Sequence, residues 1–172
     1  MVGAIGIKPT DKLWFSLIGF GGREEAGFTQ SLWGGSVLGG WQATEKLGFG
    51  MELDYFNFFN PSTAVPSGDS PVWSTGFWAS YDFTKKVGVG LRAEFLSDKD
   101  GVDASGGALG FTNPPGVGQD LTSIALTLNY KPIPSLKIQP EVRYDHSSLA
   151  NGEPFDPFHV HSNVIVNLFG AH

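Results

Sequence analysis

"GVGLRAEFLSDKDG", residues 88–101, alternates between two kinds of side chain along most of its length. Val89, Leu91 and Phe95 fall at every second position, and Arg92 and Glu94 lie between them. Successive side chains of a β-strand point to opposite faces, so this stretch predicts a strand with one apolar face. Its other face carries glycines and two opposite charges. The function of the protein depends on which of these two faces meets water.

The same alternation recurs along the chain. It is clear in "KLGFGMELDYF" (46–56), "LKIQPEVRYDH" (136–146) and "FHVHSNVIVNLF" (158–169). No segment shows a helical period, so the sequence predicts an all-β protein. The expected strands are residues 2–8, 12–22, 30–43, 46–59, 72–83, 86–97, 121–131, 135–146 and 158–169.

The connections between these segments alternate between short and long. Tight turns are expected near Thr44, Thr84 and Pro132, where Lys, Thr and Pro gather as they do in hairpins. The connections at 60–71, 98–120 and 147–157 are longer and rich in Gly, Pro, Ser and Asp. This order predicts a meander of hairpins with tight turns on one side of the molecule and long loops on the other.

Composition limits the class of protein. The 172 residues suffice for one domain over residues 1–172, and with no cysteine the chain can form neither a disulfide nor a thiolate metal site. The net charge of −6 argues against nucleic acid, which requires a basic stripe. No apolar run approaches the roughly 18 residues of a membrane helix.

Several features indicate that the apolar face meets lipid. Aromatic residues gather near the ends of the segments, for example Trp73, Tyr81 and Tyr130, as in the interfacial girdles of outer-membrane barrels. The segments are about as long as tilted membrane strands, which need about 9–11 residues. Short turns on one side and long loops on the other are also typical of such barrels. The residues expected to face lipid are Leu53, Val89, Leu91, Leu128 and Val142.

The predicted fold is therefore an antiparallel, up-and-down transmembrane β-barrel, with about 8–9 strands in this chain, complete or as part of a larger barrel. A soluble ligand-binding β-barrel, apolar inside and charged outside, is the alternative from another class. Small residues at Gly48, Gly50, Ser74 and Gly76 favour the membrane barrel, because soluble surfaces carry larger polar residues at such positions.

Charged residues on the other face are expected to line the interior. In a pore, opposed carboxylates and cations set the charge selectivity, whereas in a barrel plugged by its own side chains they are structural ion pairs. Pairing across the turn near Thr84 is expected to bring Trp78 opposite Arg92, with the guanidinium group on the indole. The predicted pore-lining residues are Glu52, Asp54, Asp82, Arg92, Glu94, Lys137, Glu141, Arg143 and Asp145.

Other candidate chemistry is weaker. His159 and His161 form a His-x-His pair near Asp145, but no third ligand is evident, so no metal is expected. Glu52 and Asp54 share a face as an acid and a base would, yet no nucleophile has a base beside it. The sequence predicts neither an enzyme nor a cofactor.

The segments "YDFTKKVGVGLRAEFLSDKDGV" (81–102) and "LTSIALTLNYKPIPSLKIQPEVRYDHS" (121–147), with the valine-rich last strand, resemble the OmpL-like β-barrel porin family. The resemblance covers most of residues 46–168 and is to the C-terminal portion of the family. It implies a channel in the bacterial outer membrane, in contact with outer-membrane lipid, through which small solutes or ions diffuse passively. Whether the chain forms a homo-oligomer or receives strands from another chain stays open.

Overall fold

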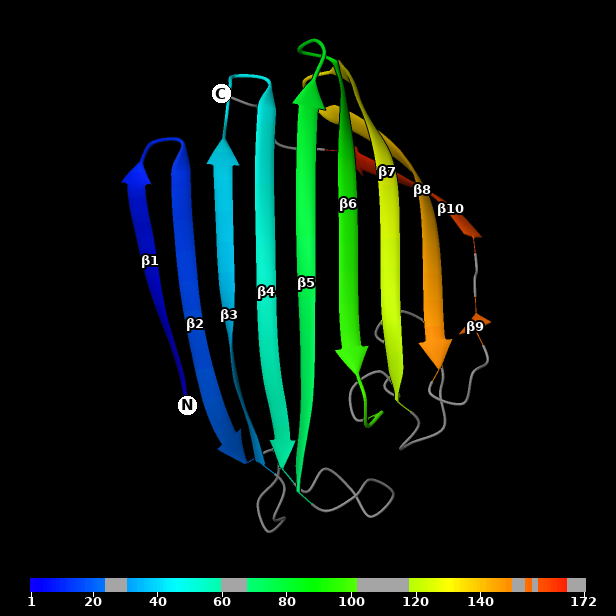
Figure 1. The fold of residues 1–172 in the computed structure, drawn as a ribbon. Coiled ribbons are helices and arrows are strands. Elements are labelled where there is room, and N and C mark those ends of the chain that lie inside the picture. Colours follow the sequence, from blue (N-terminus) through cyan, green and yellow to red (C-terminus); the bar gives the residue numbers. More distant parts are fainter. Residues whose placement is uncertain (24–30, 60–67, 102–117, 150–153, 156–157, 167–172) are drawn as a thin grey trace.

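A computed structural model describes residues 1–23, 31–59, 68–101, 118–149, 154–155 and 158–166, and from residue 149 onward it describes the backbone alone. These residues form one ten-stranded sheet (Figure 1). The strands are β1 (Val2–Thr10), β2 (Leu13–Arg23), β3 (Ser31–Gln42), β4 (Leu47–Phe59), β5 (Asp69–Asp82), β6 (Val87–Asp98), β7 (Gln119–Ile133), β8 (Leu136–Leu149), β9 (Pro154–Phe155) and β10 (Phe158–Val166).

The strands follow one another in an up-and-down order, which confirms the predicted meander. Each long strand pairs antiparallel with the next, β10 pairs with β8, and the two-residue β9 pairs with the end of β8. The sheet curls so that β10 passes behind the earlier strands, while β1 and β10 form its two edges (Figure 1). The last predicted strand ends at residue 169, and residues 167–169 lie outside the described part of the chain. No helix among the described residues is long and apolar enough to span a bilayer.

Register keeps the apolar and charged side chains on opposite faces across the sheet. On β6, Leu91 lies opposite Leu126 of β7, and the next residue, Arg92, lies opposite Ala125. The same order continues through β4 and β5, where Glu52 pairs with Gly76. A shift of one residue would exchange the two faces. The alternation seen in single segments therefore becomes a property of the whole sheet.

Two of the tight turns share one hydrogen-bonding arrangement. The hydroxyl Oγ1 of Thr44 accepts hydrogen bonds from the backbone N–H groups of Lys46 and Leu47, at 3.2 and 3.0 Å. The hydroxyl Oγ1 of Thr84 accepts hydrogen bonds from the backbone N–H groups of Lys86 and Val87, at 3.1 and 3.0 Å. Threonine side chains stabilise turns in this way by satisfying backbone donors that have no strand partner.

The first strands, β1 to β3, differ from the rest because their only charged residues, Lys8 and Arg23, lie near strand ends. The pairing of β2 with β3 fixes which of its side chains lie on each face. Phe15 and Leu17 continue the apolar outer face, and the inward positions between the turns are also uncharged. Those inward positions include Ser16, Ile18, Phe20, Ser36 and Leu38. The charged part of the inner face therefore starts at β4.

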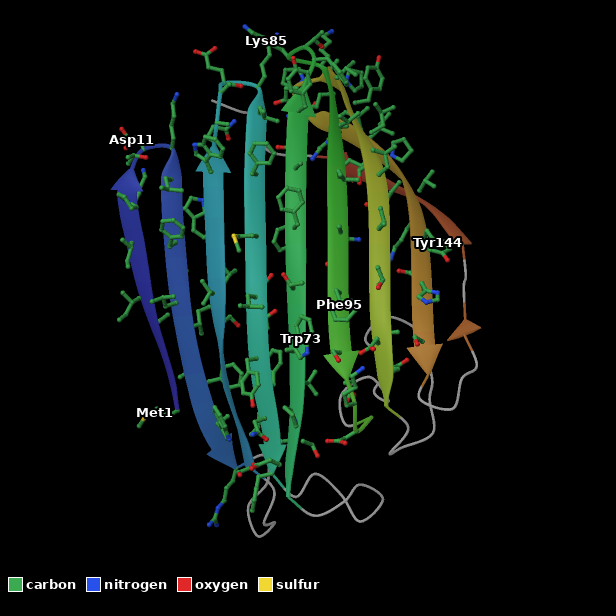
Figure 2. The ribbon with its side chains drawn as sticks, in the orientation of Figure 1. Met1, Asp11, Trp73, Lys85, Phe95 and Tyr144 are labelled. Atoms are coloured by element: carbon green, nitrogen blue, oxygen red, sulfur yellow. The ribbon has the colours of Figure 1, made fainter. Side chains whose placement is uncertain are left out.

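Aromatic residues on the apolar face lie near both ends of the strands. Toward the long connections, Trp73 packs on Phe95 with ring centroids 4.9 Å apart, and Trp33 packs on Tyr55 at 5.6 Å. Toward the tight turns, Trp41 stacks on Phe49 and Tyr81 meets Phe83. Figure 2 shows Trp73 and Phe95 in the half of the sheet that is farther from Asp11 and Lys85. This distribution matches the two aromatic girdles of an outer-membrane barrel.

Candidate functional site on the concave face

The residues predicted to face lipid lie on the apolar face. Leu53, Leu91, Leu128 and Val142 are between 42 and 46% exposed, although all are apolar. Val89 is on the same face, opposite Tyr81 and Leu128, and is partly covered. On β7, Ile124, Leu126 and Leu128 are exposed, while the alternate residues Ser123 and Ala125 are buried. The outer surface of the sheet is thus a continuous apolar layer.

The predicted pore residues lie on the other, more covered face. Register joins Glu52 to Glu94 through Gly76, and Glu94 to Asp145 through Ser123. Asp82 lies on this face at the tight-turn end, where it is exposed. We call the set on β4–β8 the charged wall; it comprises Glu52, Asp54, Arg92, Glu94, Lys137, Glu141, Arg143 and Asp145.

Arg92 lies at the centre of the charged wall. Its Nε is 3.4 Å from Oε2 of Glu94 on the same strand, and its Nη2 is 3.5 Å from Oε1 of Glu141, two strands away. The second oxygen of Glu141 accepts a 2.7 Å hydrogen bond from the Thr127 hydroxyl. All three charged side chains remain between 20 and 33% exposed, so they form a network that is still in contact with solvent.

A second ion pair lies deeper in the wall. Nε of Arg143 donates a 2.7 Å hydrogen bond to Oδ1 of Asp145. These side chains are only 17 and 4% exposed, which makes this pair the more enclosed of the two. A buried pair has to match its desolvation cost with good geometry, so this contact favours a structural role for Arg143.

Trp78 lies opposite Arg92 in the register, as the sequence predicted, but the expected stacking of the guanidinium group on the indole is wrong. The indole extends instead along its own strand over Gly76, where an added Cβ would lie 3.0 Å from Cη2 of Trp78. A larger residue at that position would require the ring to move by a few tenths of an ångström. Arg92 makes ion pairs with Glu94 and Glu141 in place of the aromatic contact.

Two cavities meet at Trp78. The first, about 210 Å³, is bordered by the carboxylates of Glu52, Asp54 and Glu94 and by no basic side chain; we call it the acidic cavity. The second, about 330 Å³, is bordered by Arg92 and Lys137 as well as Glu141. The charged wall is therefore divided into an acidic part and a part of mixed charge.

Buried polar side chains lie on the inner face at the end that carries the long connections. Asp98 is fully buried and Gln119 is 2% exposed, although both are polar. The hydroxyl of Ser147 donates a 3.0 Å hydrogen bond to Oε1 of Gln119. These buried polar residues are not predictable from the sequence, because Asp98 and Gln119 lie where loops are expected.

Metal binding has no support in the described side chains, among which no cluster of three or more acidic or histidine groups could hold an ion. The histidine pair is expected near Asp145, and the backbone register aligns His159 with Arg143 and His161 with Glu141, on the strand that carries Asp145. Their side chains lie outside the described part of the structure, so their ligand role stays a prediction.

An up-and-down antiparallel sheet with an apolar outside, two aromatic girdles and a charged inside defines the class of transmembrane β-barrels. The family model described as "Putative beta-barrel porin-2, OmpL-like" matches residues 1–167. The chain belongs to this family, and it is an outer-membrane porin-like channel. The match includes the first 45 residues, which the resemblance seen in the sequence did not cover.

A solved structure has the same fold. The crystal structure titled "NanC porin structure in rhombohedral crystal form" aligns with a TM-score of 0.54 and 14% sequence identity. The alignment covers 97% of this chain and 92% of the NanC chain. A comparison with curated protein sequences finds no significant match.

Proposed function

We propose that the charged wall lines the aqueous path of this channel and makes it prefer cations. The main observation behind the proposal is the separation of the apolar and charged faces, which leaves the charged side chains of β4–β8 together on the concave side. Charges that line a pore act on passing ions at close range. The nine predicted pore residues include six carboxylates and three basic groups, so their summed charge is negative.

The acidic cavity supports the direction of this preference. Its three carboxylates have Arg92 as the neighbouring cation, and Arg92 also faces Glu141. Cations therefore meet a net attractive field beside Glu52 and Asp54. The deeper Arg143–Asp145 pair is neutral as a unit and contributes mainly to the stability of the wall.

The remaining parts of the proposal follow from the same architecture. Residues 1–172 act as one barrel domain in the bacterial outer membrane, and Leu53, Val89, Leu91, Leu128 and Val142 contact lipid. Passage is passive and involves no catalysis, cofactor or nucleic acid. A homo-oligomer of barrels packed side by side, or strands that another chain adds to β1 and β10 at the edges of the described sheet, is compatible with this architecture.

Planar bilayers test the proposal directly. The purified protein is expected to give discrete conductance steps, and under a KCl gradient its reversal potential should shift toward the potassium equilibrium potential. Glu45→Gln, at an exposed turn outside the charged wall, serves as a control and should leave that potential unchanged. A potential shifted toward chloride would contradict the proposed preference. Absence of any conductance from a folded protein would favour a plugged barrel.

A further inference from the structure

The acidic cavity contains a polar group without a partner. Ser123 is 3% exposed, and its hydroxyl makes no hydrogen bond although it borders the cavity. A buried polar atom without a partner is costly, commonly by about 1–3 kcal/mol. In this position the hydroxyl oxygen is free to accept a hydrogen bond from a solute in the cavity.

The other walls of the cavity are of two kinds. The carboxylates of Glu52, Asp54 and Glu94 provide negative charge, and the Ser74 hydroxyl orients Asp54 through a 2.8 Å hydrogen bond to its Oδ2. The indole of Trp78 provides a flat apolar surface where it covers Gly76. Acceptors and an aromatic face therefore border the same space.

We infer that the acidic cavity is a binding site for a small organic cation, a primary ammonium group on a short apolar body. The ammonium group donates hydrogen bonds to the carboxylates and to Ser123, and the apolar body lies on Trp78. The volume of about 210 Å³ is below the ~300–1,000 Å³ of pockets for drug-sized ligands, so the solute is small. This inference rests on the proposed function, because it names the class of solute that the cation-preferring wall retains.

Phenethylammonium is a suitable probe because it combines an ammonium group with a phenyl ring. Added to a planar bilayer, it is expected to reduce the potassium current through the parent channel in a saturable way. The neutral 2-phenylethanol should block at least tenfold more weakly. Glu52→Gln is expected to weaken block by phenethylammonium about tenfold, on the order of one charge-assisted hydrogen bond. Ser123→Ala and Trp78→Leu should each weaken it several-fold.

The matched control is Glu45→Gln, which makes the same chemical change at an exposed turn outside the cavity. Equal block in the Glu52→Gln and Glu45→Gln proteins, or equal block by the ammonium and the alcohol, would overturn the site. Titration calorimetry of phenethylammonium into the folded protein in detergent measures the same affinities without current. If the protein does not conduct, the proposed function fails, and calorimetry still decides whether the site exists.

Discussion

Arg92 and Glu141 are joined across two strands of the sheet, with Nη2 of the arginine 3.5 Å from Oε1 of the glutamate. Thr127, on the strand between them, donates its hydroxyl proton to the other carboxylate oxygen at 2.7 Å. The contact therefore links β6, β7 and β8 through side chains as well as through the backbone. It also holds the positive charge of Arg92 between two carboxylates of the wall, those of Glu94 and Glu141.

Removing Arg92 or Glu94 is predicted to move ion selectivity in opposite directions. Arg92→Ala takes one positive charge from the wall, so cation preference should rise, and Glu94→Ala should shift selectivity toward anions. Reversal potentials under a salt gradient measure both changes. Each variant should also lose about 1 kcal/mol of stability, the usual scale for a partly exposed ion pair.

Arg92→Lys is the control for charge, and it should keep the reversal potential near that of the parent. A pair with only a structural role would behave differently. In that case both alanine variants would melt at lower temperature, and neither would move the reversal potential.

Placing a charge on the apolar face is predicted to destabilise the protein far more than placing it on the neighbouring lumen position. Leu128→Arg should cost about 2–4 kcal/mol in a bilayer, because Leu128 belongs to the outer apolar layer. Thr127→Arg, one residue earlier on the inner face, should cost much less, since Glu141 is within reach. Chemical unfolding in lipid vesicles measures the difference, and equal costs would contradict the assignment of the two faces.

Spin labels test the same assignment without adding charge. The chain has no cysteine, so single cysteines can be labelled specifically. Labels at Val89 and Val142 should be accessible to oxygen, which concentrates in the bilayer. A label at Ser80, exposed on the inner face, should instead be accessible to a water-soluble nickel chelate.

The two ends of the strands are predicted to lie on opposite sides of the membrane. Asp69→Cys, at the exposed start of β5, should react with a membrane-impermeant maleimide in intact cells. Lys85→Cys, in the exposed turn between β5 and β6, should react only after the cells are permeabilised. Labelling of Lys85→Cys alone in intact cells would reverse the orientation.

The threonine turns are predicted to contribute to stability through their hydroxyl groups. Thr84→Ala removes the acceptor for the N–H groups of Lys86 and Val87, and should lower the free energy of unfolding by about 1 kcal/mol. Thr84→Ser keeps the oxygen and should restore most of that loss. Comparing the unfolding midpoints of the two variants separates the hydrogen bond from the packing of the methyl group.

Much of the fold follows from period-two alternation, because a shift of one residue would exchange the two faces, and a short turn then selects among the registers that keep them separate. The pairing of Trp78 with Arg92 is predictable in this way from a short turn. The extension of β5 back to Asp69 is not, since the segment before Trp73 contains Pro71 and polar residues that favour loops.

The site is less predictable than the fold. Alternation places Arg92 on the inner face, but it does not say whether the side chain turns to Trp78, Glu94 or Glu141. That choice depends on distances across three strands and on the space that Gly76 leaves for the indole. The role of Ser123 is equally unpredictable from the sequence, because many of the inward positions are occupied by small residues and nothing in the pattern distinguishes this serine from the others.

The direction of the edge strands limits how the ring can close. The described part of the chain has nine long strands in up-and-down order, so β1 and β10 run the same way. Direct contact between them would be a parallel seam, and an all-antiparallel ring needs an odd number of strands in the gap. A second copy rotated about the membrane normal presents its own β1 to β10 in that same direction. A second copy therefore adds another parallel contact between β10 and β1. A single strand of opposite direction, placed between β10 and β1, would make every contact in the ring antiparallel.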